Sequence, residues 1–246
     1  MEQGLKVNRV SYTYQTLQGE TKSLEEVSFA VEKSQFVAIV GPSGCGKTTL
    51  LNIIAGLLKD YEGTVEIQAP IGYMFQKDQL LEWRTIYKNV VLGLEIKQKV
   101  NAETLSRVEK MLKRYGLYEF RNAYPRQLSG GMRQRAALVR TLALAPNLLL
   151  LDEPFSALDA QTRIQVSEDI GTIIRQEKIT TVMVTHDLSE AITMADKVLV
   201  LSKRPGHIVK EVEIILDKDR PRRTQEKFKD YFQEIWREIN EDNENP

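Results

Sequence analysis

The apolar residues of this chain fall into short runs that alternate with longer stretches of helical periodicity. Phe36 to Val40 is short and apolar, as expected of a strand buried on both faces, and Leu148 to Leu151 has the same character. Thr181 to Thr185 is a β-branched run that also indicates a buried strand. In Lys47 to Leu57 the apolar residues recur at helical spacing instead. This alternation predicts an α/β fold built on a parallel sheet.

Two stretches interrupt the alternation. Leu5 to Val31 contains two or three strand-like runs with a polar turn at Gln18 to Glu20, which predicts an antiparallel β-subdomain. From about Trp83 to Leu128 the pattern is helical, and in Ala102 to Tyr115 the apolar residues lie on one face. We interpret this stretch as an inserted helical subdomain that continues into a helix from Gly131 to Leu144.

The C-terminal part predicts further strand material and one amphipathic helix. Strands are expected at Ile208 to Val209 and at Val212 to Leu216, and the basic run Arg220 to Arg223 is interpreted as a solvated turn rather than a contact with anionic lipid. A helix is expected from about Thr224 to Asn240 and should pack on the domain. The residues at helical spacing are Phe228, Tyr231, Phe232, Ile235, Trp236 and Ile239. No motif repeats and no Gly/Ser-rich linker divides the 246 residues, so we expect one domain, 1–246.

The most specific motif is the segment Gly41 to Thr48, which has the spacing G-x-x-x-x-G-K-[ST] between an expected strand and an expected helix. Glycines let backbone N–H groups point inward as an anion nest, and the start of the helix adds partial positive charge. Lys47 is expected to reach the β and γ phosphates, and the Thr48 hydroxyl to ligate Mg²⁺. The segment therefore predicts a site for a nucleoside triphosphate.

Two adjacent acids end the apolar run at Leu148 to Leu151. Ligands of open α/β sheets gather at the carboxyl ends of the strands, so Asp152 is expected to face the Mg²⁺ shell. Glu153 would then orient or deprotonate the attacking water. Taken without Gly41 to Thr48, these acids would better suit an ordinary polar turn after a buried strand.

The segment Leu128 to Arg135, Leu-Ser-Gly-Gly-Met-Arg-Gln-Arg, resembles the signature of ABC ATPases. The other motifs of that family occur in the family's order across nearly the whole chain. The resemblance implies an ABC cassette of the P-loop NTPase fold that binds ATP with Mg²⁺, and two cassettes that pack head to tail. Each ATP is then held by the phosphate loop of one cassette and by Ser129, Gly130 and Gly131 of the other. The expected loop contacts are Gly41, Pro42, Ser43, Gly44, Cys45, Gly46, Lys47, Thr48 and Thr49.

The resemblance also assigns single residues outside these motifs. Gln76 stands in the lid position and is expected to approach Mg²⁺ and the attacking water, and His186 is expected to contact the γ-phosphate. Tyr14 is assigned to stacking on adenine, with Tyr12 on the same face of the strand as the alternative. Asp159 matches an aspartate that contacts the partner cassette, and it also suits the N-cap of the helix that follows. His207 is assigned no role.

Cys45 is the one cysteine of the chain. Inside the phosphate loop, neighbouring N–H groups and Lys47 would favour the thiolate, so a lowered pKa is expected. The alternative is a small residue that only fits the loop.

Composition excludes several classes of protein. The 34 basic residues balance the 34 acidic ones, so the chain lacks the positive excess of a nucleic-acid-binding protein. One cysteine excludes an intramolecular disulfide framework, and no apolar segment approaches the roughly 18 residues of a membrane span. No signal segment is recognised. A transport path would thus belong to transmembrane permease subunits, with the cassette peripheral on the cytoplasmic face of the membrane.

Four segments resemble cassettes of nitrate, sulfonate and taurine importers: Leu80 to Thr85, Gly131 to Arg135, Asp152 to Phe155 and Arg204 to Gly206. Such a system includes a paired cassette and an extracytoplasmic solute-binding protein. Lys77 to Thr85 is the expected surface for a helix of the permease, with Leu80, Leu81 and Trp83 exposed, although a small buried cluster is the alternative. Importers of thiamine-related pyrimidines are similar. A non-transport ABC ATPase and a P-loop small-molecule kinase are the rival classes; the kinase would need neither Leu128 to Arg135 nor His186.

Overall fold

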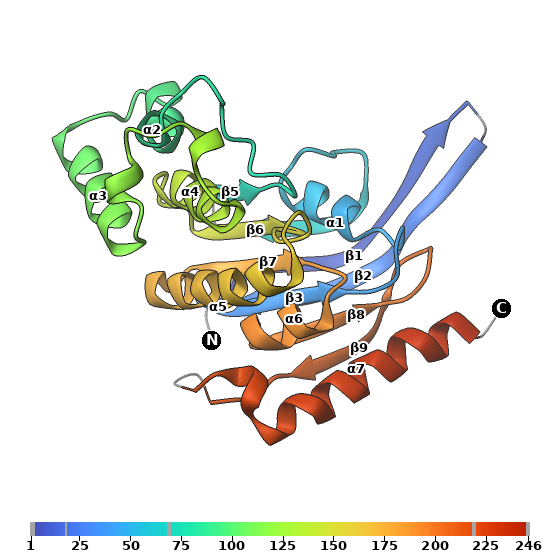
Figure 1. Cartoon of the computed structure of the whole chain (residues 1–246). Helices are drawn as coiled ribbons and strands as arrows, with labels where there is room; N and C mark the ends of the chain where they lie inside the picture. The colour runs from blue at the N-terminus through green and yellow to red at the C-terminus, as the bar shows by residue number, and fades with distance from the viewer. Residues whose placement is uncertain (1–2, 18, 68–69, 218–219, 245–246) are drawn as a thin grey trace.

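The computed structural model describes residues 3–17, 19–67, 70–217 and 220–244. Strands and helices alternate over most of this length, as the sequence pattern predicts (Figure 1). The strands are β1 Gln3–Thr16, β2 Gly19–Glu32, β3 Phe36–Val40, β4 Glu62–Ile67, β5 Ile71–Met74, β6 Leu148–Asp152, β7 Thr180–Val184, β8 Lys197–Leu201 and β9 Ile208–Glu213. The α-helices are α1 Lys47–Ile54, α2 Ile86–Ile96, α3 Ala102–Arg114, α4 Gly130–Leu142, α5 Ala160–Glu177, α6 Leu188–Met194 and α7 Glu226–Glu244.

A six-stranded sheet forms the centre, in the order β5-β6-β7-β3-β8-β9. The pairs from β5 to β8 are parallel, and β9 closes one edge as an antiparallel strand. Every residue of β3, β6 and β7 is buried, which explains why these segments are continuous apolar runs rather than alternating ones. Because the strands are parallel, β3, β6 and β7 end at the same edge of the sheet.

Successive residues of the central strands point into different cores. In β3, Ala38 faces one apolar cluster with α4, α5 and α6, whereas Val37 and Ile39 face a second cluster with α1 and the β1–β2 pair. In β6, Leu149 and Leu150 divide in the same way. The period of two along a strand therefore places one hydrophobic layer on each face of the sheet.

The N-terminal strands form a separate antiparallel sheet in the order β2-β1-β4, as expected for the β-subdomain. β1 ends at Thr16 and β2 begins at Gly19, so Gly19 and Glu20 of the predicted turn belong to a strand, and Gln18 lies outside the described residues. Figure 1 shows this long hairpin extending away from the end of the molecule that carries α2 and α3. We retain the interpretation of about 83–128 as a helical subdomain, which here contains α2, α3 and two short 3₁₀ turns.

The expected exposure of Leu80 is wrong. Leu80 is buried in the cluster beneath α2 and α4, because the Leu81 N–H and carbonyl are both bonded to the buried Asn89 side chain, which pulls this loop inward. Trp83, in contrast, is 75% exposed. The apolar surface of this loop is therefore Trp83 rather than a leucine pair.

The C-terminal segment differs from the prediction in two side chains. Helix α7 packs Ile235 into the core, with Phe228, Tyr231, Phe232 and Ile239 around it, but Trp236 is 56% exposed because it falls outside this stripe. Arg222 is buried rather than solvated. Its guanidinium donates to the carbonyls of Ile192 and Ala195 and so satisfies the C-terminal end of α6.

Candidate nucleotide site

The loop between β3 and α1 has the backbone that a phosphate nest requires. Gly44 and Gly46 have φ values of 78° and 106°, in the left-handed region that favours glycine. A Cβ added at Gly46 would lie 2.6 Å from Leu24 Cδ2 and 3.0 Å from the Ser23 carbonyl oxygen. The loop is thus packed directly against β2, and no larger residue fits at this position. Lys47 begins α1, so the N–H groups of the loop converge at a helix start.

Lys47 is buried within this loop. Its Nζ donates to the carbonyls of Gly41 at 2.8 Å and Pro42 at 2.9 Å. These bonds hold the ammonium group on the inner side of the loop, where it is positioned to neutralise phosphate oxygens.

Thr48 and Asp152 meet across the sheet edge, as the sequence predicts for a metal site. The Thr48 hydroxyl donates to Asp152 Oδ1 at 3.1 Å, and the Tyr73 hydroxyl donates to Oδ2 at 3.3 Å. Burial raises the pKa of Asp152, while these two hydrogen bonds act in the opposite direction. One hydroxyl and one carboxylate suit Mg²⁺, which is commonly held by one or two carboxylates together with substrate phosphates.

Glu153 follows β6 in a constrained conformation. Its φ is 42°, unusual for a residue with a side chain, and its N–H donates to the Val184 carbonyl at the end of β7. Ser156 adds a hydroxyl bond to the Glu153 carbonyl. The Glu153 carboxylate is then 3.2 Å from His186 Nδ1. The strand ends therefore bring together two residues that are 33 positions apart in the sequence.

Behind His186 lies a buried acid that the sequence analysis did not single out. Glu190 accepts a hydrogen bond from the Thr185 hydroxyl at 2.7 Å, and its other oxygen is 3.8 Å from Arg163 Nε. Burial raises the pKa of Glu190 to about 7, with a smaller contribution from Asp187. This network links α5 and α6 to the turn that carries His186.

Replacing Glu190 with Gln should flatten the dependence of stability on pH. Between pH 4.5 and 7 the folded chain retains a proton that the unfolded chain has released, so the free energy of unfolding falls as the pH rises through this window. The shift corresponds to about 3 kcal/mol. Urea unfolding at pH 5 and pH 8 should show this loss in the parent and in Glu109→Gln, an exposed control, but not in Glu190→Gln. An unchanged slope in Glu190→Gln would contradict the assignment.

A cavity of about 320 Å³ lies beside the phosphate loop. Besides the phosphate loop it is bounded by Tyr14, Glu153 and Arg204. The Tyr14 hydroxyl lies 3.0 Å from Thr49 Oγ1, and the Tyr12 ring packs edge-on against Tyr14 with centroids 4.8 Å apart. Only Tyr14 of the two tyrosines lines this cavity, in keeping with its assignment. The lining residues are Tyr14, Ser23, Ser43, Gly44, Gly46, Lys47, Thr48, Thr49, Glu153 and Arg204.

The signature segment forms a second helix start. Ser129 caps α4 by accepting the Met132 N–H at 3.4 Å. Cβ atoms added at Gly130 and Gly131 would lie 2.8 Å from Leu158 and 2.6 Å from Val166, so both glycines permit close packing. None of these three residues lines the cavity at the phosphate loop. The two predicted anion sites of one chain are therefore separate.

Two further assignments are placed by their local contacts. Asp159 accepts the Thr162 N–H at 3.0 Å and caps α5, as its residue type predicts. Gln76 is exposed just after β5 and is not among the residues that line the cavity, so its lid role remains a prediction.

The lowered pKa expected for Cys45 is wrong. The side chain is 1% exposed and lies in the apolar cluster under the loop, so burial raises the pKa of the thiol despite the nearby Lys47. The N–H of Cys45 belongs to the loop, but its sulfur faces the core. The alternative interpretation therefore applies: Cys45 is a small residue that fits the loop.

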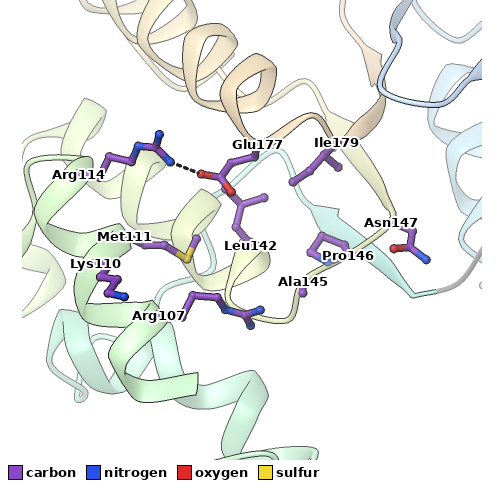
Figure 2. A pocket seen from close by; sticks show the side chains of 10 residues that line it. All are labelled: Arg107, Lys110, Met111, Arg114, Leu142, Ala145, Pro146, Asn147, Glu177 and Ile179. Carbon is purple, nitrogen blue, oxygen red and sulfur yellow. Dashed lines mark hydrogen bonds and ion pairs between the residues drawn. The ribbon is translucent and has the colours of Figure 1, made fainter. Parts of the chain in front are cut away.

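A second cleft, of about 370 Å³, lies at the other ends of the strands, between α3 and the turn before β6 (Figure 2). Its walls carry Arg107 and Arg114, but Arg114 pairs with Glu177 at 2.9 Å, and Arg107 donates to the Ala143 carbonyl. The cleft also lies beside Asn147 and Ile179, near the amino ends of β6 and β7. It is therefore not the phosphate site.

Comparison with known proteins decides the family. Residues 24–156 match the model of the ABC transporter family. The chain is 43% identical to the ABC transporter ATP-binding protein YtlC of Bacillus subtilis, covering 96% of this chain and 95% of YtlC. The chain belongs to the ABC transporter family.

Other relatives extend this result. The chain is 38% identical to the aliphatic sulfonates import ATP-binding protein SsuB of Bacillus cereus, covering 96% of this chain and 94% of that protein. It also resembles the solved structure of the ATP-binding cassette MJ0796 as a post-hydrolysis dimer bound to ADP and Pi. The TM-score is 0.72 and the identity is 31%, over 85% of this chain and 98% of that one. This ABC cassette is thus the ATPase subunit of a transporter, and the expectations of fold and enzyme class are confirmed.

Tertiary structure adds residues to the cassette's nucleotide site that sequence reasoning missed. Tyr73 bonds Asp152, Ser23 lies 3.3 Å from Thr49, and Arg204 reaches the phosphate loop. Tyr73 was detectable, because β5 ends next to β6 in a parallel sheet. Nothing in the spacing of Ser23 or Arg204 indicated their positions. No helix in the described parts of the chain is long and apolar enough to cross a bilayer.

Proposed function

We propose that this cassette powers a small-solute importer by binding and hydrolysing Mg²⁺-ATP in a head-to-tail dimer. The observation that carries the proposal is the convergence of Lys47, Thr48, Asp152 and Glu153 at one edge of the sheet. Three functions needed for phosphoryl transfer meet there: a cation for the phosphates, oxygen ligands for the metal, and a carboxylate for water.

Each residue has a distinct task in this proposal. Thr48 and Asp152 hold Mg²⁺, which supplies charge neutralisation for the phosphates when it is bound. Lys47 leaves the two loop carbonyls to contact phosphate oxygens, and Tyr14 stacks on adenine. Glu153 accepts the proton of the attacking water, while His186, 3.2 Å away, orients that carboxylate and contacts the γ-phosphate.

The second helix start completes the site in a dimer. Ser129, Gly130 and Gly131 lie away from their own phosphate loop, so they serve the nucleotide of the partner cassette. The dimer of MJ0796 is consistent with this arrangement. We infer that Asp159, at the start of α5, lies at the same interface, and that Gln76 completes the site when the cassette closes.

The permease is expected to dock on the loop that carries Trp83. This indole is 75% exposed beside α2, and the surrounding loop is tied to the signature helix through Arg133, which pairs with Asp78 at 2.8 Å and Glu82 at 2.9 Å. A movement of the permease docked at the cytoplasmic face of the membrane would therefore be transmitted through α4 to Ser129 at the start of that helix. The SsuB relative makes an aliphatic sulfonate the first solute to test, ahead of nitrate and taurine.

Reconstitution with the co-purified permease and its solute-binding protein tests the proposal. Vesicles energised with Mg²⁺-ATP on the cassette side should take up an alkanesulfonate, and the solute should stimulate hydrolysis. A complex with Lys47→Ala cassettes is the matched control and should do neither. Stimulation by a thiamine-related pyrimidine instead would overturn the sulfonate assignment alone, whereas a cassette that co-purifies with no permease would contradict the importer.

A further inference from the structure

Arg204 reaches the phosphate loop from a distant part of the chain. It belongs to the turn between β8 and β9, 160 positions after Gly44. Its Nε and Nη2 both donate to the Gly44 carbonyl, at 3.0 and 2.9 Å. A guanidinium that donates two bonds to one oxygen is held in a defined orientation. Arg204 also lines the cavity that contains Lys47 and Glu153.

The turn that carries Arg204 is fixed against the same loop. Gly206 donates to the Ser23 carbonyl at 2.9 Å and accepts from the Glu25 N–H at 3.0 Å, which docks the turn on β2. A Cβ added at Gly206 would lie only 2.1 Å from the Cys45 carbonyl oxygen, so the turn touches the phosphate loop backbone directly. These tertiary contacts of the turn therefore fix the position of Arg204 relative to the phosphate loop.

The turn is also braced from within. The Ser202 hydroxyl accepts the His207 N–H at 3.0 Å and lies 2.9 Å from His207 Nδ1. His207, which the sequence analysis left without a role, thus holds the two ends of this turn together.

The charge of Arg204 has no acidic partner in the described part of the chain. No carboxylate there forms an ion pair with it, whereas Arg133 and Arg163 each have two. A cation at the rim of a phosphate cavity without a protein counter-charge is available to a bound anion.

We propose that Arg204 is a further nucleotide-binding residue of this cassette: its guanidinium anchors the Gly44 peptide and places a positive charge against the phosphates of bound ATP. The inference rests on the phosphate loop's proposed role. Because a triphosphate carries more negative charge than a diphosphate, Arg204 contributes more to binding of ATP than of ADP.

Equilibrium binding of Mg²⁺-ATP and Mg²⁺-ADP to the full chain tests this proposal. Arg204→Gln should raise the Kd for ATP about tenfold and the Kd for ADP about threefold, as expected for the loss of one charge-assisted contact. Arg204→Lys should show a smaller loss, because it keeps the charge but not the two-pronged geometry.

Lys203→Gln removes the neighbouring exposed charge outside the cavity and is the matched control, with affinity expected to match the parent's. Unchanged ATP affinity in Arg204→Gln would overturn the inference. Equal weakening of ATP and ADP, together with a lower melting temperature, would also overturn it and indicate a structural role. Failure of the parent to bind ATP, or normal binding by Lys47→Ala, would count against the proposed site itself and not against Arg204 in particular.

Discussion

Replacing Glu153 with Gln should lower the ATP turnover rate by at least about a hundredfold while ATP binding is retained. Gln has nearly the shape of Glu, and its amide oxygen still accepts hydrogen bonds, but it does not accept the proton of the attacking water. The neighbouring contacts predict this separation of roles, because Thr48, Asp152 and Lys47 do not depend on the Glu153 carboxylate. ATP binding should therefore produce a long-lived dimer that elutes early in size-exclusion chromatography.

Glu109→Gln provides the control for loss of one carboxylate. Glu109 is exposed on α3, away from the cavity, and its variant should hydrolyse ATP at the parental rate without a trapped dimer. Parental turnover in Glu153→Gln would refute the water-activating role. A variant that stays monomeric with saturating ATP would contradict the proposed sequence of binding, dimer closure and hydrolysis.

Replacing Ser129 with Arg should abolish hydrolysis by a different route, with ATP affinity of the single chain unchanged. A bulky cation at the start of α4 would obstruct the helix end that is proposed to meet the partner's nucleotide, but Ser129 does not line its own phosphate cavity. Introduced into the Glu153→Gln background, the substitution should also prevent the ATP-dependent dimer. Persistence of that dimer would place Ser129 outside the interface.

Asn101→Arg is a close control, because Asn101 caps α3 as Ser129 caps α4 and is likewise exposed. It introduces the same cation and removes a cap of the same kind, yet it should leave turnover intact.

Mixing Ser129→Arg with Lys47→Ala tests whether the two chains share each site. A heterodimer of these variants contains one site damaged twice and one intact site, so the mixture should regain up to roughly a quarter of parental activity if the sites act independently. Sites confined to single chains would instead leave the mixture as inactive as its components.

Local sequence predicted the phosphate loop and the strands around it because both depend on contiguous residues. A glycine-rich turn between an apolar strand and a helix has few other uses, and Gly41 to Thr48 adopts that arrangement here. The helices that begin after Ser129 and Asp159 were also predictable, because a capping side chain bonds only to N–H groups in the first turn of its own helix. The errors at Leu80 and Trp236 arose where a single residue's exposure depends on a remote neighbour.

The relative placement of distant residues was decided by the tertiary structure. Parallel pairing of β6 with β7 brings Glu153 to His186, and docking of the β8–β9 turn brings Arg204 to Gly44, although neither pair shares any local pattern. The same packing turns the sulfur of Cys45 into the core and reverses the expected direction of its pKa shift. Sequence alone therefore determined which chemical groups the loop contains, because they are consecutive. Only the fold determined which other groups reach it, because burial and charge at a point in space depend on every element that packs there.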